Sequence, residues 1–275
     1  MRPRRIRFIS PAIALLGAVL ISTSAAADPG PITAATLPSR PANASGFVLD
    51  GFGGLHPYAA GTAVMPAAAV GNPYWPGWDA ARGVAIPHTN NPTWGLVVDL
   101  FGGLHPFGIG RPAPSLSITG ATYWLGHDLA RQVALMPDGN SGVVLDAYGG
   151  LHPFSINSGT PPTFAGTPYW PGWKIAKGIT IMPNSAGGYV LDGLGGLHPF
   201  SINGVSPPPI VDGPYWPTHS RARGVTMLAD GSGGYIVDCF GAVFPFSSTA
   251  GTDPQIPSGT PSWPGWKIAR SMANE

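Results

Sequence analysis

Two sets of charged residues recur at nearly equal spacing along the chain, one member in each of five repeats. The aspartates are Asp50, Asp99, Asp146, Asp192 and Asp238, and the cations are Arg82, Arg131, Lys177, Arg223 and Arg270. A ring of carboxylates could do acid–base chemistry, but catalysis needs carboxylates with differentiated roles. We therefore favour a structural role, in which each aspartate caps a tight turn and pairs with a cation of a neighbouring strand.

Four histidines recur a few residues after the aspartates. They are His56, His105, His152 and His198, and Phe244 takes the fifth place. Imidazole is a common metal ligand, but replacement by phenylalanine is typical of a packed ring, so we expect no metal and no other cofactor. His127 and His219 stand where other repeats have Trp78, Trp173 and Trp266, which indicates either flat-ring packing or an aromatic platform at this position.

Repeated aromatic residues are the best candidates for binding a ligand. The set comprises Trp75, Trp124, Trp170, Trp216 and Trp263, with Tyr74, Tyr123, Tyr169 and Tyr215 before four of them. Two interpretations remain open. The tryptophans wedge between neighbouring repeats, or part of the set lines pockets in which a flat ring with a polar N–H suits the CH face of a sugar. A second set, Phe52, Phe101, Tyr148, Leu194 and Phe240, lies in the tight turns and is expected to pack against the next repeat.

Enzymatic motifs are absent from the sequence. Glu275, the last residue, is the only glutamate, so a carboxylate pair of the glycosidase kind would have to be built from aspartates alone. No H-E-x-x-H, G-x-S-x-G, P-loop or EF-hand pattern occurs. Cys239 is the only cysteine, which excludes an internal disulfide. We expect no catalytic residues and no enzyme, with an Asp-dependent hydrolase as the least favoured alternative.

The charged and aromatic residues sit in two alternating blocks. A hairpin block, GFVLDGFGGLHPY from Gly46, returns with small changes from Gly95, Gly142, Gly188 and Gly234, and a YWPGWDAAR-type block follows each copy. Each unit contains three short apolar runs bounded by glycine and proline, which predict strands such as 222–227, 234–238 and 242–246. The proline inside the third strand predicts that any fourth strand is short or begins beyond it.

Repeats of about 46 residues with a few strands each are typical of β-propeller blades. The array begins with a hairpin that lacks its own Ala-Arg strand and ends with such a strand, Lys267 to Arg270, that lacks a hairpin. We therefore predict an all-β, five-bladed β-propeller in which the C-terminal strand joins the N-terminal hairpin and closes the ring.

The repeat units resemble those of secreted bacterial proteins with β-propeller-like repeats of uncharacterised role. The resemblance covers about 230 residues and implies the propeller fold without an activity. Five-bladed propellers in general include the lectin tachylectin-2 and several glycosidase families, and the similarity to them is one of architecture.

The remaining segments predict an exported protein. Residues 1–27 combine four arginines, an apolar run and an Ala-Ala-Ala cleavage signal, which is typical of a signal peptide. Residues 28–45 are expected to be a disordered linker and residues 46–275 the propeller. We expect a secreted protein, extracellular or associated with the cell envelope, that is a monomer without a membrane span after signal removal. Because no lysines or arginines cluster beyond the signal, nucleic acid is a poor partner.

These observations favour a non-catalytic, multivalent binding module whose ligand is a polysaccharide or other glycan. Weak sites repeated around a ring gain avidity without a single strong site. The alternative is a protein-interaction or structural envelope protein that binds a surface protein through its variable, proline-rich loops.

Overall fold

The computed structural model describes residues 39–40, 43–89, 91–248 and 253–275, all within the second of two compact units, residues 31–275. The expected signal peptide and residues 28–38 of the expected linker lie outside the described residues. The described residues form strands, turns and loops. Within them there is no helix long and apolar enough to cross a membrane.

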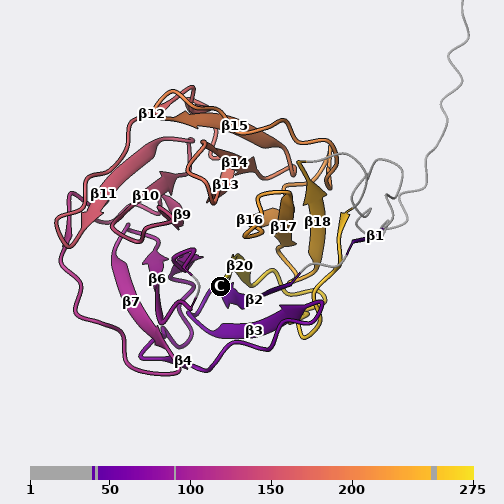
Figure 1. Ribbon diagram of the computed structural model, residues 1–275, viewed down its shortest axis with the longest axis horizontal. Coiled ribbons are helices and arrows are strands. Elements are labelled where there is room, and N and C mark those ends of the chain that lie inside the picture. Colours follow the sequence, from indigo (N-terminus) through magenta and orange to yellow (C-terminus); the bar gives the residue numbers. More distant parts are fainter. Residues whose placement is uncertain (1–38, 41–42, 90, 249–252) are drawn as a thin grey trace, which may run out of the picture. The chain divides into compact units, whose positions relative to one another are not determined.

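Five small antiparallel sheets stand around a common axis (Figure 1), which confirms the five-bladed β-propeller. Blade 1 contains β20 (Ala269–Asn274), β2 (Ala44–Asp50) and β3 (Leu55–Ala60). Blade 2 contains β4 (Ala69–Val70), β5 (Ala81–Ala85), β6 (Trp94–Asp99) and β7 (Leu104–Ile109). Blade 3 contains β8 (Ile118–Thr119), β9 (Ala130–Leu135), β10 (Ser141–Asp146) and β11 (Leu151–Ile156).

Blade 4 contains β12 (Phe164–Ala165), β13 (Ala176–Ile181), β14 (Gly188–Asp192) and β15 (Leu197–Ile202), and blade 5 contains β16 (Ala222–Met227), β17 (Gly233–Asp238) and β18 (Val243–Ser247). The strands β20, β5, β9, β13 and β16 are innermost and contact one another around the axis (Figure 1). A separate pair of two-residue strands, β1 (Ser39–Arg40) and β19 (Asp253–Pro254), is parallel.

The ring closes as the sequence predicts. Strand β20 pairs with β2 in antiparallel register, from Gly46 opposite Asn274 to Asp50 opposite Ala269. The buried Tyr58 hydroxyl donates to the Ala273 carbonyl oxygen and contacts Asn274 Oδ1. The C-terminus therefore lies beside the axis (Figure 1), and the two ends of the repeat array complete one blade.

The linker expectation is wrong for part of its range. Residues 39–40 form β1, and Ala44 and Ser45 begin β2, where they pair with Ala60 and Ala59. The first hairpin is thus longer than the repeated block because the alternating pairing continues past Gly46.

The proline rule is confirmed in blades 2 to 4. Their outermost strands, β4, β8 and β12, have two residues each and pair with the third strand only beyond Pro106, Pro153 and Pro199. A proline has no N–H to donate, so the outer edge cannot be paired at that residue.

The innermost strands approach one another closely at the axis. A Cβ added to Gly83 would lie 2.5 Å from Gln132 Cα, and one added to Gly224 would lie 2.5 Å from Ser271 Cα. Gln132 crosses the axis: its Nε2 donates to the Val225 carbonyl oxygen and its Oε1 accepts from Ile179 N–H. A Cβ added to Gly178 would lie 2.7 Å from Gln132 Oε1, so glycine at this position of blade 4 makes room for the glutamine side chain of blade 3.

Candidate functional site

Each repeated aspartate ends the second strand of its blade, counted from the axis, and organises the tight turn that leads to the third strand. Asp99 Oδ1 accepts from the N–H groups of Phe101 and Gly103 at 2.8 and 2.9 Å, and Oδ2 lies 2.9 Å from His105 Nε2. The same arrangement recurs at Asp50, Asp146 and Asp192. The turn cap predicted from the sequence is present.

The predicted pairing of these aspartates with the repeated cations is wrong, because a histidine on the next strand takes that position. In the fifth repeat Phe244 replaces the histidine, and Arg221 Nε donates to Asp238 Oδ2 at 2.9 Å. Burial raises the pKa of Asp99, but the hydrogen bonds from His105 and from the two turn N–H groups outweigh it, so its pKa is lowered. The repeated histidines thus complete a structural unit on four of the five blades, and Arg221 does so on blade 5.

The five repeated tryptophans lie between consecutive blades. Trp75 N–H donates to the Phe52 carbonyl oxygen of blade 1, and its indole packs edge-on against His105 of blade 2, with ring centroids 5.2 Å apart. Trp124, Trp170 and Trp263 pack against a histidine in the same way, and Trp216 packs against Phe244. Trp216 is fully buried and the other four are half-buried. These indoles therefore wedge blades together.

A different aromatic set faces solvent. The exposed members are Tyr74, Tyr123, Tyr169 and Tyr215 together with Trp78, Trp173 and Trp266, each with 43–60% of its surface accessible. They lie in the loops that lead into the innermost strands, next to the tight turns. Phe101 in one such turn lies 6.1 Å from Trp78 and 6.2 Å from Tyr123 between ring centroids. The tyrosines are among the predicted binding residues, whereas for Trp78, Trp173 and Trp266 sequence reasoning left open flat-ring packing or an aromatic platform.

A hollow of about 220 Å³ opens on the same face. All its lining residues are charged: Arg82, Arg131, Lys177, Arg223, Arg270, Asp79 and Asp128. Each cation is the extra residue of a β-bulge, for example Arg82, which has no partner between Ala81 opposite Asp99 and Gly83 opposite Val98. A bulge interrupts the side-chain alternation and re-aims a side chain. This is why the cations gather here and not beside the repeated aspartates.

Two aspartates neutralise only part of this charge. Asp128 Oδ2 lies 2.8 Å from Arg82 Nη2, and Asp128 Oδ1 lies 2.8 Å from Arg131 Nη1. Asp79 pairs with Arg82 and Arg270. Burial raises the pKa of Asp128, but the hydrogen bonds and charges of the two arginines lower it to about 2.

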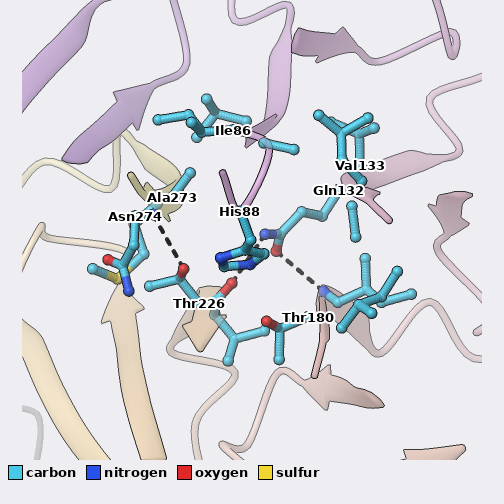
Figure 2. Close-up of a pocket in the computed structure, with 16 residues that line it drawn as sticks. Ile86, His88, Gln132, Val133, Thr180, Thr226, Ala273 and Asn274 are labelled. Carbon is cyan, nitrogen blue, oxygen red and sulfur yellow. Dashed lines mark hydrogen bonds between the residues drawn. The ribbon is translucent and has the colours of Figure 1, made fainter. Parts of the chain in front are cut away.

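The opposite end of the axis holds a much smaller space, about 30 Å³. Figure 2 shows His88 there among Gln132, Thr226 and Asn274, which come from three other blades. Burial lowers the pKa of His88. Sequence reasoning missed this histidine because the comparable positions after the other innermost strands hold Asp138, Asn184 and Asp230, so no repeated pattern singled it out. The space is about that of one water molecule.

Cys239 is buried in the turn after β17, and burial raises the pKa of its thiol. No group of three or more His, Cys, Asp or Glu side chains in the described ranges is placed to hold a metal ion.

No protein-family model and no curated protein matches the chain. Solved structures with similarity include a chain of a nidogen/laminin complex, with 10% identity, a TM-score of 0.43, and coverage of 84% of this chain and 98% of that one. Another is a candidate 6-phosphogluconolactonase from Bacteroides uniformis, with 12% identity, a TM-score of 0.40, and coverage of 81% and 68%.

Proposed function

We propose that the protein is a secreted, non-catalytic, carbohydrate-binding module whose ligand lies on the face that carries the exposed tyrosines and tryptophans. The carrying observation is that Tyr74 and Trp78, and again Tyr169 and Trp173, stay exposed four residues apart in equivalent loops. A large apolar ring left in solvent with a polar tip is suited to the CH face of a sugar. Repetition around the ring supports multivalent binding.

A glycan array with the purified protein tests this proposal. We expect binding to a subset of glycans, and a loss of at least tenfold in a variant with Tyr74, Trp78, Tyr169 and Trp173 changed to alanine. Val64→Ala/Ile256→Ala is the matched control, because those apolar side chains are also exposed but lie in other loops. A blank array with folded protein, or equal losses in both variants, contradicts the proposal.

A protein partner is the second candidate, and a different observation favours it. Val64 and Met65 are exposed on one variable loop, and Ile256 is exposed on another. Met65 lies close to Gly259, which belongs to the loop of Ile256. Exposed apolar side chains that adjoin one another mark interaction sites. If the array is blank, pull-down of a surface protein that Val64→Asp/Ile256→Asp abolishes supports this candidate, and a pull-down that the variant leaves intact contradicts it.

A further inference from the structure

The charge lining the axial hollow is unbalanced. Five cations face two carboxylates there, which leaves a formal excess of three positive charges, since 5 − 2 = 3. Arg82, Arg131 and Arg270 share Asp79 and Asp128. Within the described chain, neither Lys177 nor Arg223 has a carboxylate partner: Lys177 Nζ donates to the Lys174 carbonyl oxygen at 3.2 Å, and Arg223 Nη1 donates to the carbonyl oxygens of Ser220 and Ala222.

The cationic groups are held in place before any ligand arrives. Arg82, Arg131, Arg223 and Arg270 each donate to the carbonyl oxygen of the preceding alanine, and each also donates to a carbonyl three residues back. The side chains of Arg82, Arg131 and Arg270 are only 12–14% exposed. Fixed donors around a shared point bind an anion with little loss of side-chain freedom.

Repulsion among the cations also favours an anion in the hollow. Burial, together with the positive charges of Arg131, Arg223 and Arg270, lowers the pKa of Lys177 to about 8. Burial and the charge of Arg270 also lower the pKa of Arg223, although Cys239 and Asp238 act against them. An anion in the hollow would relieve this repulsion, because an opposite charge at close range favours the charged form of each cation.

The hollow has a limited size. Directly after Arg131, the Gln132 side chain reaches two other blades: its Nε2 donates to the Val225 carbonyl oxygen and its Oε1 accepts from Ile179 N–H. A volume of about 220 Å³ corresponds to roughly seven water molecules at ~30 Å³ each. The site therefore suits a single compact group and not a threaded chain.

We propose that the axial hollow is an oxyanion-binding site, in which Lys177 and Arg223, with Arg131 beside them, take one phosphate, sulfate or carboxylate group. This assignment goes beyond the proposed sugar-binding face and does not depend on it. The anion is either free or carried by an acidic saccharide that also lies on the surrounding aromatic side chains. The exposed Trp78 directly precedes Asp79, a lining residue of the hollow, in the chain.

Isothermal titration with sodium sulfate at low chloride concentration tests the site. We expect saturable binding that Lys177→Gln/Arg223→Gln weakens at least tenfold. The matched control is Lys174→Gln/Lys267→Gln, which removes two positive charges from the loops that lead into β13 and β20, outside the hollow, and we expect it to change the affinity less than twofold. Because the first variant relieves repulsion, it should fold with an unchanged or higher melting temperature. Absence of sulfate binding, or equal weakening in the control, overturns the proposal.

A second titration distinguishes the two sources of the anion. It uses a tetrasaccharide of alternating glucuronic acid and N-acetylglucosamine, and the neutral N-acetylglucosamine tetramer. If sulfate binds, and the acidic tetrasaccharide binds at least tenfold more tightly than the neutral tetramer, the result supports an anion carried on a glycan. Sulfate binding without that gain supports a free oxyanion. A Tyr74→Ala/Trp78→Ala variant that loses the sugars and keeps sulfate separates failure of the sugar-binding face from failure of the hollow.

Discussion

At the scale of single residues, each repeated aspartate accepts three hydrogen bonds that fix one tight turn. We expect Asp99→Ala to lower the free energy of unfolding by about 1–3 kcal/mol, because two turn N–H groups and His105 lose their acceptor. Asp138→Ala is the control, since that exposed carboxylate caps the turn after β9 without a histidine. Urea denaturation measures both. Equal stability of the two variants would contradict the assigned role.

The same carboxylates predict acid sensitivity. The pKa values of Asp50, Asp99 and Asp146 are lowered in the folded state, so their contribution is complete above the ordinary aspartate pKa of about 3.9 and is lost as pH falls through the lower folded value. Stability of the wild type should therefore fall below about pH 4, and its advantage over Asp99→Ala should shrink there. An advantage that stays constant down to pH 2 would refute this linkage.

Lys177 predicts a second pH effect, of opposite direction. Its pKa of about 8 means that the cation is lost as pH rises from 7 to 9, so sulfate affinity should decline several-fold over that range. Lys177→Gln should show a flat profile. The groups that face Lys177 in the hollow are Arg82, Arg131, Arg223, Arg270, Asp79 and Asp128. A wild-type profile as flat as that of the variant would count against the role of this lysine.

At the scale of the strand, the position after each bulge cation on the innermost strands accepts a Cβ only where the neighbouring strand leaves room for it. Gly83→Ala should cost about 2 kcal/mol or more, since its Cβ would meet the backbone of Gln132. Ser271→Ala is the matched control at the same position of blade 1, where a Cβ is already accommodated, and it loses only a 3.3 Å hydrogen bond from Val84 N–H. Thermal unfolding compares them. Equal losses of stability in Gly83→Ala and Ser271→Ala would contradict the claim that the close approach of the strands excludes a Cβ at Gly83.

Much of this level could be predicted from the sequence. The repeated glycines predict the turns, and the repeated prolines predict the late start of the fourth strands. Both predictions depend on a property of the residue itself: the φ values open to glycine and the missing N–H of proline. The β-bulge at Arg82 could not be predicted, since it exists only in the pairing of two strands. Without the bulge, equal spacing cannot show whether Asp99 meets Arg82 or His105. For the same reason, the sequence does not distinguish the half-buried Trp75 from the exposed Trp78, three residues later.

At the scale of the whole propeller unit, stability depends on a strand contributed by the C-terminus. A chain that ends at residue 268 lacks β20 and leaves the inner edge of β2 unpaired. We expect it to lose roughly 5 kcal/mol or more, a large part of the total stability of a folded protein, and to unfold without a single cooperative transition. Addition of a peptide of residues 267–275 should restore the transition. Full stability without β20 would contradict the closed ring.

The central claim is that one face of the ring combines exposed aromatic side chains with a cationic centre. The most direct test is the indole N–H spectrum of the nine tryptophans during titration with the glucuronic acid and N-acetylglucosamine tetrasaccharide. Signals of Trp78, Trp173 and Trp266 should shift in a saturable way, while those of Trp94 in β6 and of the interblade Trp75, Trp124, Trp170, Trp216 and Trp263 should stay in place. Shifts confined to the interblade tryptophans, or no shifts in any of the nine, would contradict the account.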